Sequence, residues 1–242
     1  MCLIALAYKV HPRYPLIVAA NRDEFLDRPT RPAHFWEDDP HVLAGRDLQA
    51  GGTWLGVTRR GRFAAVTNHR DLRRTPVNGP SRGQLVRTAL DDDPPGGGTY
   101  MGYNLLYGAY DTLRYRNNVQ PVDEPLPAGI HGLSNHLLNS PWPKVLRATT
   151  GLAHLVEGPD DALVEGLFDL LADRTEAPDA LLPDTGLSLE QERRVSAIFI
   201  RTPRYGTRCS TVVLVDAHGQ VCFEERTADG GHRVREVFGT VR

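Results

Sequence analysis

The sequence contains little cysteine and no long apolar run. Its three cysteines, Cys2, Cys209 and Cys222, are far apart and form no CxxC pair, which excludes a disulfide framework and a zinc site built on such pairs. We expect the last two to be buried thiols, out of register on neighbouring strands. No apolar run reaches the roughly 20 residues of a membrane-spanning helix, and no basic segment precedes the short apolar run at the start. These absences favour a cytoplasmic protein with neither a membrane span nor a secretory signal.

A strong charge of either sign is also missing. The formal net charge is −2, so nothing in the composition suggests a nucleic-acid partner. Hydrophobic residues make up 40% of the chain and charged residues 24%, which is enough apolar material for a folded core. Because no internal repeat or linker is visible, we expect a single domain over residues 1–242.

Apolar runs separated by turn residues predict that much of the chain is β-strand. Strands tend to follow strands along the sequence, which favours antiparallel pairing over a repeated β-α-β unit. Apolar residues at helical spacing predict a helical segment at about 140–175, between two β blocks. The expected strands are 2–8, 16–20, 53–58, 62–67, 102–108, 111–116, 195–201, 210–216 and 220–226, and the expected helices are 81–92, 143–156 and 160–172.

A cysteine at position 2 is an unusual start for an apolar strand. Removal of Met1 would make Cys2 the first residue, which would then carry both a thiol and a free α-amine. The unperturbed pKa of an α-amine is about 7.7–8.0, so this amine can accept the thiol proton near neutral pH. The alternative is that Cys2 is a small buried residue of the first strand without a chemical role.

Four consecutive polar residues, NRDE at 21–24, end the second predicted strand. A short turn joins this strand to the first, so we expect Arg22 beside Cys2, where its charge would lower the pKa of the thiol, and Asp23 near the amine. Side chains alternate along a strand, so Arg22 and Asp23 should point to opposite faces. Either a bulge redirects one of them, or only one enters the site. On a regular strand, Arg22 would share its face with Glu24, and Asn21 with Asp23. A surface ion-pair cluster is the alternative interpretation.

Two asparagines stand where apolar strands end, Asn68 in AAVTNHR and Asn135 in HGLSNH. A side-chain amide can donate a hydrogen bond to the oxyanion of an acyl-transfer reaction, and one such donor contributes about 3–4 kcal/mol. The alternative is that each asparagine begins a loop by bonding to its own backbone.

An ordered set of motifs covers nearly the whole chain. Cys2 and NRDE are followed by AGRDLQAGGTWLGV at 44–57, TNHR at 67–70, SRGQLV at 81–86, GYNLLYG at 102–108, HGLSN at 131–135 and GTRCSTVVLVD at 206–216. Together these motifs resemble the NRDE-domain family, which in eukaryotes is the transport and Golgi organisation protein 2 family. That family resembles the N-terminal nucleophile hydrolases of the penicillin V acylase and bile-salt hydrolase branch.

The resemblance implies an α+β fold, a four-layer αββα sandwich of two antiparallel sheets. It also implies hydrolysis of an amide or related acyl bond in a small-molecule substrate, with a cysteine nucleophile, its own amine as base and no required cofactor. In the hydrolase branch the arginine and aspartate are separated by two residues, whereas here they are adjacent. The residues that the resemblance assigns to the site are Cys2, Arg22, Asp23, Asn68, Asn135 and Arg201.

A second interpretation is a binding or trafficking protein on the same fold. The eukaryotic family is linked to haem mobilisation, lipid metabolism and Golgi organisation, which suggests haem or a lipid-like acyl group as the ligand. The sequence has no Cys-Pro haem-regulatory pair and no CxxCH motif. Cys2 is a candidate thiolate ligand, and a scaffold with a degenerate site is a third possibility. The candidate axial histidines, most of which we expect on the surface, are His11, His69, His131 and His136.

Overall fold

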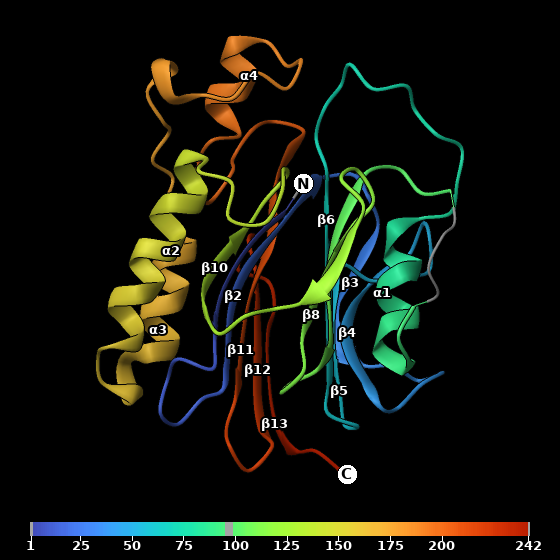
Figure 1. The fold of residues 1–242 in the computed structure, drawn as a ribbon, viewed down its shortest axis with the longest axis vertical. Coiled ribbons are helices and arrows are strands. Elements are labelled where there is room, and N and C mark those ends of the chain that lie inside the picture. Colours follow the sequence, from blue (N-terminus) through green and yellow to red (C-terminus); the bar gives the residue numbers. More distant parts are fainter. Residues whose placement is uncertain (1, 95–98, 242) are drawn as a thin grey trace.

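The computed structural model describes residues 2–94 and 99–241. Within these ranges the chain forms a six-stranded and a seven-stranded sheet, both antiparallel. The two sheets face each other, with α2 and α3 outside the first sheet and α1 outside the second (Figure 1). This arrangement is the four-layer αββα sandwich expected from the sequence.

The first sheet carries both ends of the described chain. Its spatial order is β10-β1-β2-β11-β12-β13, so the first two strands lie between strands from much later in the sequence. Strands β2 and β11 are the long central pair and run the length of the sheet. The bounds are β1 (Cys2–Tyr8), β2 (Leu16–Phe25), β10 (Gly129–Leu133), β11 (Tyr205–Val215), β12 (Gln220–Thr227) and β13 (Arg233–Gly239).

The second sheet is a meander in which each strand pairs with the next along the chain. Strands β5 and β6, which match the predicted strands 53–58 and 62–67, form a hairpin, and Gly61 in its turn has a φ of 79°, a conformation that favours glycine. The bounds are β3 (Thr30–Phe35), β4 (Val42–Asp47), β5 (Leu55–Thr58), β6 (Arg62–Asn68), β7 (Tyr103–Ala109), β8 (Arg114–Asn117) and β9 (Val122–Pro125).

The three predicted helices are present with closely similar bounds. They are α1 (Arg82–Asp91), α2 (Pro143–Val156) and α3 (Asp160–Leu171), followed by the short η1 (Asp179–Leu181) and α4 (Leu189–Arg194). Ser81 caps α1, because its hydroxyl accepts a hydrogen bond from the Gly83 N–H. In the part of the chain that the structure describes, no helix is both long and apolar enough to cross a membrane.

The predicted strand at 195–201 is wrong. Residues 195–200 form turns and bends, and Arg201 makes an isolated bridge with Gly206. The apolar side chains of this segment are nevertheless buried, Ile198 among them. Its backbone groups bond to partners other than a neighbouring strand backbone. The Phe199 N–H donates to the Asp173 carbonyl, and the Ile198 carbonyl accepts from the buried side chain of Asn21. An apolar run can therefore be buried as a loop when other groups satisfy its backbone.

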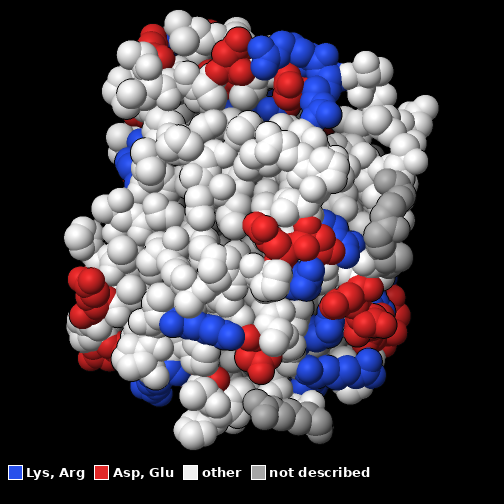
Figure 2. Space-filling view, viewed as in Figure 1, with Lys and Arg blue, Asp and Glu red and all other residues white. Residues whose placement is uncertain are grey.

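Charged side chains on the face shown in Figure 2 gather in clusters where Lys or Arg lies near Asp or Glu, while a broad middle band carries few charges. The ion pairs of the second sheet show the same matching of opposite charges. Arg114 and Arg116 both bind Asp123, with nitrogen–oxygen distances of 2.9 and 2.6 Å. Surface arginines of this chain are thus commonly neutralised by a neighbouring carboxylate.

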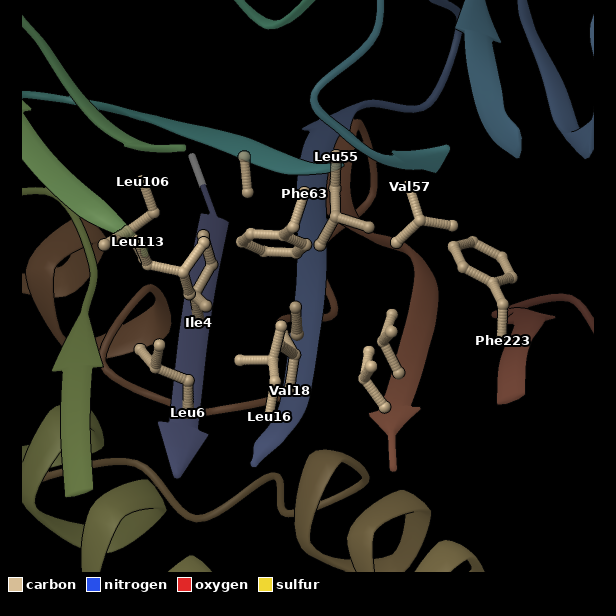
Figure 3. Close-up of a cluster of buried hydrophobic side chains, with 14 of the residues drawn as sticks. Ile4, Leu6, Leu16, Val18, Leu55, Val57, Phe63, Leu106, Leu113 and Phe223 are labelled. Atoms are coloured by element: carbon tan, nitrogen blue, oxygen red, sulfur yellow. The ribbon is translucent and has the colours of Figure 1, made fainter. Parts of the chain in front are cut away.

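The main core lies between the two sheets (Figure 3). Along β1, Ile4 and Leu6 point into this core, whereas Leu3 and Ala5 pack on the other face against α2 and α3. The same alternation along β2 determines which of its polar residues can reach the interior between the sheets. The labelled core side chains are Ile4, Leu6, Leu16, Val18, Leu55, Val57, Phe63, Leu106, Leu113 and Phe223.

Candidate functional site

A cavity of about 580 Å³ is lined by residues of both sheets and includes the start of β1. Its volume lies within the range of roughly 300–1,000 Å³ that small-molecule sites occupy. Cys2 and Arg22 line it from the first sheet, and Val66 and Asn68 from the second. Four of the six residues assigned to the site by resemblance contribute to its wall: Cys2, Arg22, Asp23 and Asn68.

Cys2 lies directly opposite Arg22 in the antiparallel ladder of β1 and β2. The thiol is almost enclosed, with the residue 8% exposed. Burial raises the pKa of this thiol, while the Arg22 charge and a hydrogen bond from the Asp23 backbone N–H oppose that rise. The Cys2 carbonyl accepts a bond from the Ser134 hydroxyl at 3.2 Å, which ties the start of β1 to β10.

Arg22 and Asp23 point to opposite faces of β2, as the alternation predicts. Arg22 lies on the face between the sheets, where its guanidinium donates to the Thr30 hydroxyl at 3.3 Å, and Asp23 shares the helix-covered face with Asn21. The bulge that could have redirected one of them lies instead in the neighbouring strand β11, between Thr207 and Cys209. Both residues still reach the cavity because it opens at the end of the strand.

Asp23 is fully buried and belongs to a polar cluster that extends behind the cavity. One of its carboxylate oxygens accepts a 2.7 Å hydrogen bond from the Thr207 hydroxyl. Burial raises the pKa of this carboxyl, and the nearby Lys144 charge opposes the rise. Asp23 therefore lies in the cavity wall, and its carboxylate extends into the buried polar cluster behind it.

Lys144 is a charged residue of this cluster that the sequence analysis missed. It lies on α2, is only 2% exposed, and its ammonium has no hydrogen-bond partner among the described residues. Burial lowers its pKa to about 8, against the opposing effect of Asp23. The available signal was its spacing: Lys144 precedes Ala148 and Leu152 by four and eight residues, which places it on the apolar face of the helix.

The two asparagines have different positions. Asn68 lines the cavity, and within residues 2–94 and 99–241 its side chain makes no hydrogen bond. Asn135 is fully buried outside the lining; its amide donates to the Asn68 carbonyl at 3.1 Å, and its carbonyl oxygen accepts from Ser134. The Thr67 hydroxyl bonds the Ser134 carbonyl at 2.5 Å. Asn135 thus supports the backbone that presents Asn68.

Arg201 and the candidate histidines lie apart from this cavity. Arg201 is exposed and is not among the residues that line it. None of His11, His69, His131 and His136 contributes to the lining, whereas His232, which the sequence analysis did not select, does. Both ring nitrogens of His131 contact neighbours, the Pro127 carbonyl and Asn139. Among the described residues, no group of three or more His, Cys, Asp or Glu side chains is arranged to hold a metal ion.

Two glycines explain how the AGG and SRG motifs build the wall of the cavity. A Cβ on Gly52 would lie 2.5 Å from the Gly83 backbone, and a Cβ on Gly83 would lie 3.0 Å from the Thr53 carbonyl. The Thr53 N–H also donates to the Gly83 carbonyl at 3.3 Å. Only residues without side chains allow this approach, which sets the first residue of α1, Arg82, into the lining.

The other two cysteines differ from each other. Cys209 is buried and lines the cavity, whereas Cys222 is only half-buried, so the expectation of a buried thiol is wrong for Cys222. The register confirms that they do not face each other, because Cys209 pairs with Thr227 and Cys222 pairs with Leu214. Cys222 lies on the helix-covered face of β12, where it is only partly buried.

The chain is similar in sequence to known proteins over most of its length. Residues 1–230 match the model of the family described as Transport and Golgi organisation 2. This chain belongs to that family. The human Transport and Golgi organization protein 2 homolog is 35% identical over 257 residues, covering 94% of this chain and 93% of its own length. The Drosophila melanogaster protein is 28% identical over 267 residues, covering 95% and 93%.

A solved structure shows the fold that this family member adopts. The Cys2→Ala mutant of conjugated bile acid hydrolase from Clostridium perfringens superposes with a TM-score of 0.52 at 8% sequence identity, covering 98% of this chain and 92% of that chain. The sandwich is therefore the N-terminal nucleophile hydrolase fold. At this level of identity the likeness concerns the fold alone.

Proposed function

We propose that this member of the Transport and Golgi organisation 2 family is a cytoplasmic hydrolase that cleaves an amide or related acyl bond of a small molecule. The observation that carries the proposal is the environment of Cys2. Its thiol is set opposite Arg22, receives the Asp23 backbone N–H, and lines a cavity large enough for a small molecule. A buried cysteine with only a packing role needs neither the cation nor the cavity.

The first chemical step transfers the acyl group to sulfur. After removal of Met1, the α-amine of Cys2 accepts the thiol proton, and the thiolate attacks the substrate carbonyl carbon. The thiol needs a base to take its proton because burial raises its pKa. The carbonyl oxygen becomes an oxyanion, for which the Asn68 amide in the cavity wall is a donor of the required type. The carbon–nitrogen bond then breaks, and the leaving amine takes the proton from the α-ammonium.

The second step regenerates the enzyme. Water attacks the thioester, the α-amine accepts its proton, and the carbon–sulfur bond breaks to release the acid. In both steps Arg22 stabilises negative charge on sulfur, and its hydrogen bond to Thr30 keeps the guanidinium beside Cys2. Asp23 acts behind the thiol, where its carboxylate orients the ammonium form of the base.

Acylation by a β-lactone probe tests this proposal. Ring opening by the Cys2 thiolate forms a thioester and adds the mass of one intact probe molecule. We expect labelling of Cys2 in protein whose intact mass shows loss of Met1, and no labelling of the Cys2→Ala variant. Cys209→Ala is the matched control, since that thiol is also buried in the cavity wall, and it should label like the wild type.

A second variant tests the role of the amine. Insertion of a glutamate between Met1 and Cys2 blocks removal of Met1 and leaves the thiol without a neighbouring α-amine. We expect this variant to lose acylation while it keeps its thermal stability. Equal labelling of the inserted variant and the wild type would contradict the proposed base. A haem-dependent Soret shift that disappears in Cys2→Ala, in the absence of acylation, would replace the hydrolase with a haem-binding function.

A further inference from the structure

Three arginines in the cavity wall bond neutral oxygens, whereas most surface arginines of this chain pair with a carboxylate. At the rim, Arg28 binds Asp47 at 2.6 Å and Arg46 binds Asp38 at 2.6 Å. In contrast, three other lining arginines bond only neutral oxygens in the described part of the chain. Arg22 donates to the Thr30 hydroxyl, and Arg82 donates to the Gly102 carbonyl. Arg208 donates to the carbonyls of Phe25 and Arg28.

Arg82 is the clearest of the three because it stands outside the proposed catalytic group. It is the first residue of α1, whose first turn contains no acidic residue. Its Nη1 donates to the Gly102 carbonyl at 3.1 Å, and the side chain is half-buried in the lining. Burial lowers the pKa of this guanidinium, while the nearby Cys2 and Glu24 act in the opposite direction. Among the described residues, this partly desolvated cation donates to a neutral carbonyl and hydrogen-bonds no carboxylate.

The carboxylates of the cavity are engaged with other groups. Glu24 accepts from the Phe25 N–H and lies 3.9 Å from Arg28. Glu225 accepts from the Ala33 N–H at 2.7 Å, and Asp229 accepts from the Thr227 hydroxyl at 2.6 Å. These carboxylates therefore leave the guanidinium groups of Arg82 and Arg208 available to an incoming anion.

Arg208 reaches the cavity through a local irregularity of the fold. The register of β11 shifts between Thr207 and Cys209, so Arg208 is the extra residue of a β-bulge. Bulges redirect a side chain without ending the strand, and they are frequent beside binding sites. The redirected guanidinium lines the same cavity as Arg82, from the first sheet, whereas Arg82 lines it from helix α1.

We propose that this cavity binds a molecule bearing a carboxylate or phosphate group, and that Arg82 and Arg208 hold that group near Cys2. A planar guanidinium can donate two parallel hydrogen bonds to either anion, and such bonds are strong where water is excluded. Anion binding stands on the arginines alone. Only the placement of a scissile bond at the sulfur rests on the proposed hydrolase function.

Equilibrium binding to the Cys2→Ala protein tests the proposal without turnover. The probes are N-acetylglycine, with its anion on the amine side, and N-methylsuccinamate, with its anion on the acyl side, each compared with its neutral methyl ester. N-acetylaminomethylphosphonate replaces the carboxylate with a phosphate-like group. Calorimetry should show at least one anionic probe binding about tenfold more tightly than its neutral counterpart.

Variants of α1 identify the cation responsible. Arg82→Gln should reduce the preference for the anionic probe to about twofold or less, and Arg82→Lys should keep part of it. Arg87→Gln is the matched control: it lies on the same helix, pairs with Asp39 and Asp91 outside the cavity, and should leave binding unchanged.

Each outcome has a definite meaning. Tighter binding of the phosphonate than of the carboxylates identifies a phosphate as the anion, and the reverse identifies a carboxylate. Equal affinity for anionic and neutral probes in the parent protein overturns the proposal, whether or not the variants fold, and so does an Arg82→Gln variant that retains the preference. Failure of Cys2 to acylate would remove the hydrolase function and leave the binding result standing.

Discussion

Arg22 separates two buried cysteines, pairing with Cys2 on β1 and with Cys209 on β11. Burial raises the pKa of both thiols, and the single guanidinium between them opposes both shifts. The two thiols therefore share one cation, while only Cys2 also receives the Asp23 backbone N–H. Burial and the nearby Glu225 charge raise the pKa of Cys209 well above its ordinary value, so we expect Cys2 to be the more reactive of the pair.

Replacement of that cation should slow the reaction of Cys2 with alkylating agents. In Arg22→Gln the thiolate loses its neighbouring positive charge, so we expect the iodoacetamide rate at pH 7.5 to fall by about tenfold per unit of pKa increase. Peptide mass mapping after timed alkylation measures the rate at each cysteine. Arg22→Lys should restore part of it, and half-buried Cys222 is the internal control. An unchanged Cys2 rate would show that the cation does not act on the thiol.

The asparagine of the NRDE motif should have a structural role. The Asn21 amide donates to the Leu171 and Ile198 carbonyls, both at 2.9 Å, and its carbonyl oxygen accepts from Ser210. Asn21→Asp places carboxylate oxygens against two carbonyl oxygens in a buried site, which should cost about 3 kcal/mol of unfolding free energy.

Urea unfolding measures the loss. Asn78→Asp, on an exposed loop, is the control and should change stability by less than about 0.5 kcal/mol. Similar stability of the two variants would argue that the asparagine of the motif acts in the site instead.

Lys144 should make stability depend on pH in the alkaline range. Its pKa in the folded protein is lowered to about 8 from 10.5, mainly by burial, so the unfolded chain binds this proton more tightly. The destabilising cost is complete below pH 8 and is relieved as the pH rises toward 10.5. Across that interval, the unfolding free energy of the wild type should increase by about 3 kcal/mol relative to Lys144→Met.

Urea titrations at pH 7.5 and 10 measure this difference, with exposed Lys9→Met as the control. If the difference in unfolding free energy between the wild type and Lys144→Met is the same at both pH values, the prediction of a lowered Lys144 pKa is wrong.

The buried ion pair between Arg70 and Glu192 should contribute more to stability than exposed pairs do. Its nitrogen–oxygen distance is 2.9 Å, both side chains are buried, and Thr185 also donates to Glu192. Arg70→Met leaves the Glu192 carboxylate buried without its cation, so we expect a loss of about 3–5 kcal/mol.

The matched control is an ion pair on α4, the short helix that carries Glu192. Arg194 pairs with Glu190 at the surface of α4, and Arg194→Met should cost less than about 0.5 kcal/mol. Thermal and urea unfolding of both variants give the comparison. Equal costs of the two substitutions would contradict the prediction that the buried pair contributes more than the exposed one.

Local patterns sufficed for elements whose partners are close in the sequence. The hairpin of β5 and β6 was predictable because its turn and both strands lie within 55–68. Helix α1 was predictable from its Ser81 cap and apolar spacing. The segment at 195–201 was not, because its apolar residues have the composition of a strand while its backbone partners, Asp173 and Asn21, come from distant parts of the chain.

Recognition of the site was partial for the same reason. Cys2 and Arg22 could be paired from sequence because a short turn connects their strands. Lys144, Arg82 and Arg208 were missed because each depends on a contact between remote segments. The position of Arg82 in the cavity wall depends on the close approach of Gly52 to Gly83. The position of Arg208 depends on a bulge in β11 that the local sequence does not predict.

The amino-acid sequence alone determined the fold class, the family and the neighbourhood of Cys2, because alternation, caps and motif order are local properties of the chain. Tertiary structure decided which buried or half-buried cations hydrogen-bond no carboxylate among the described residues: Lys144 behind the cavity and Arg82 in its wall. Burial and the removal of water arise only when distant segments pack together, and these two effects convert ordinary charged residues into chemically distinctive ones.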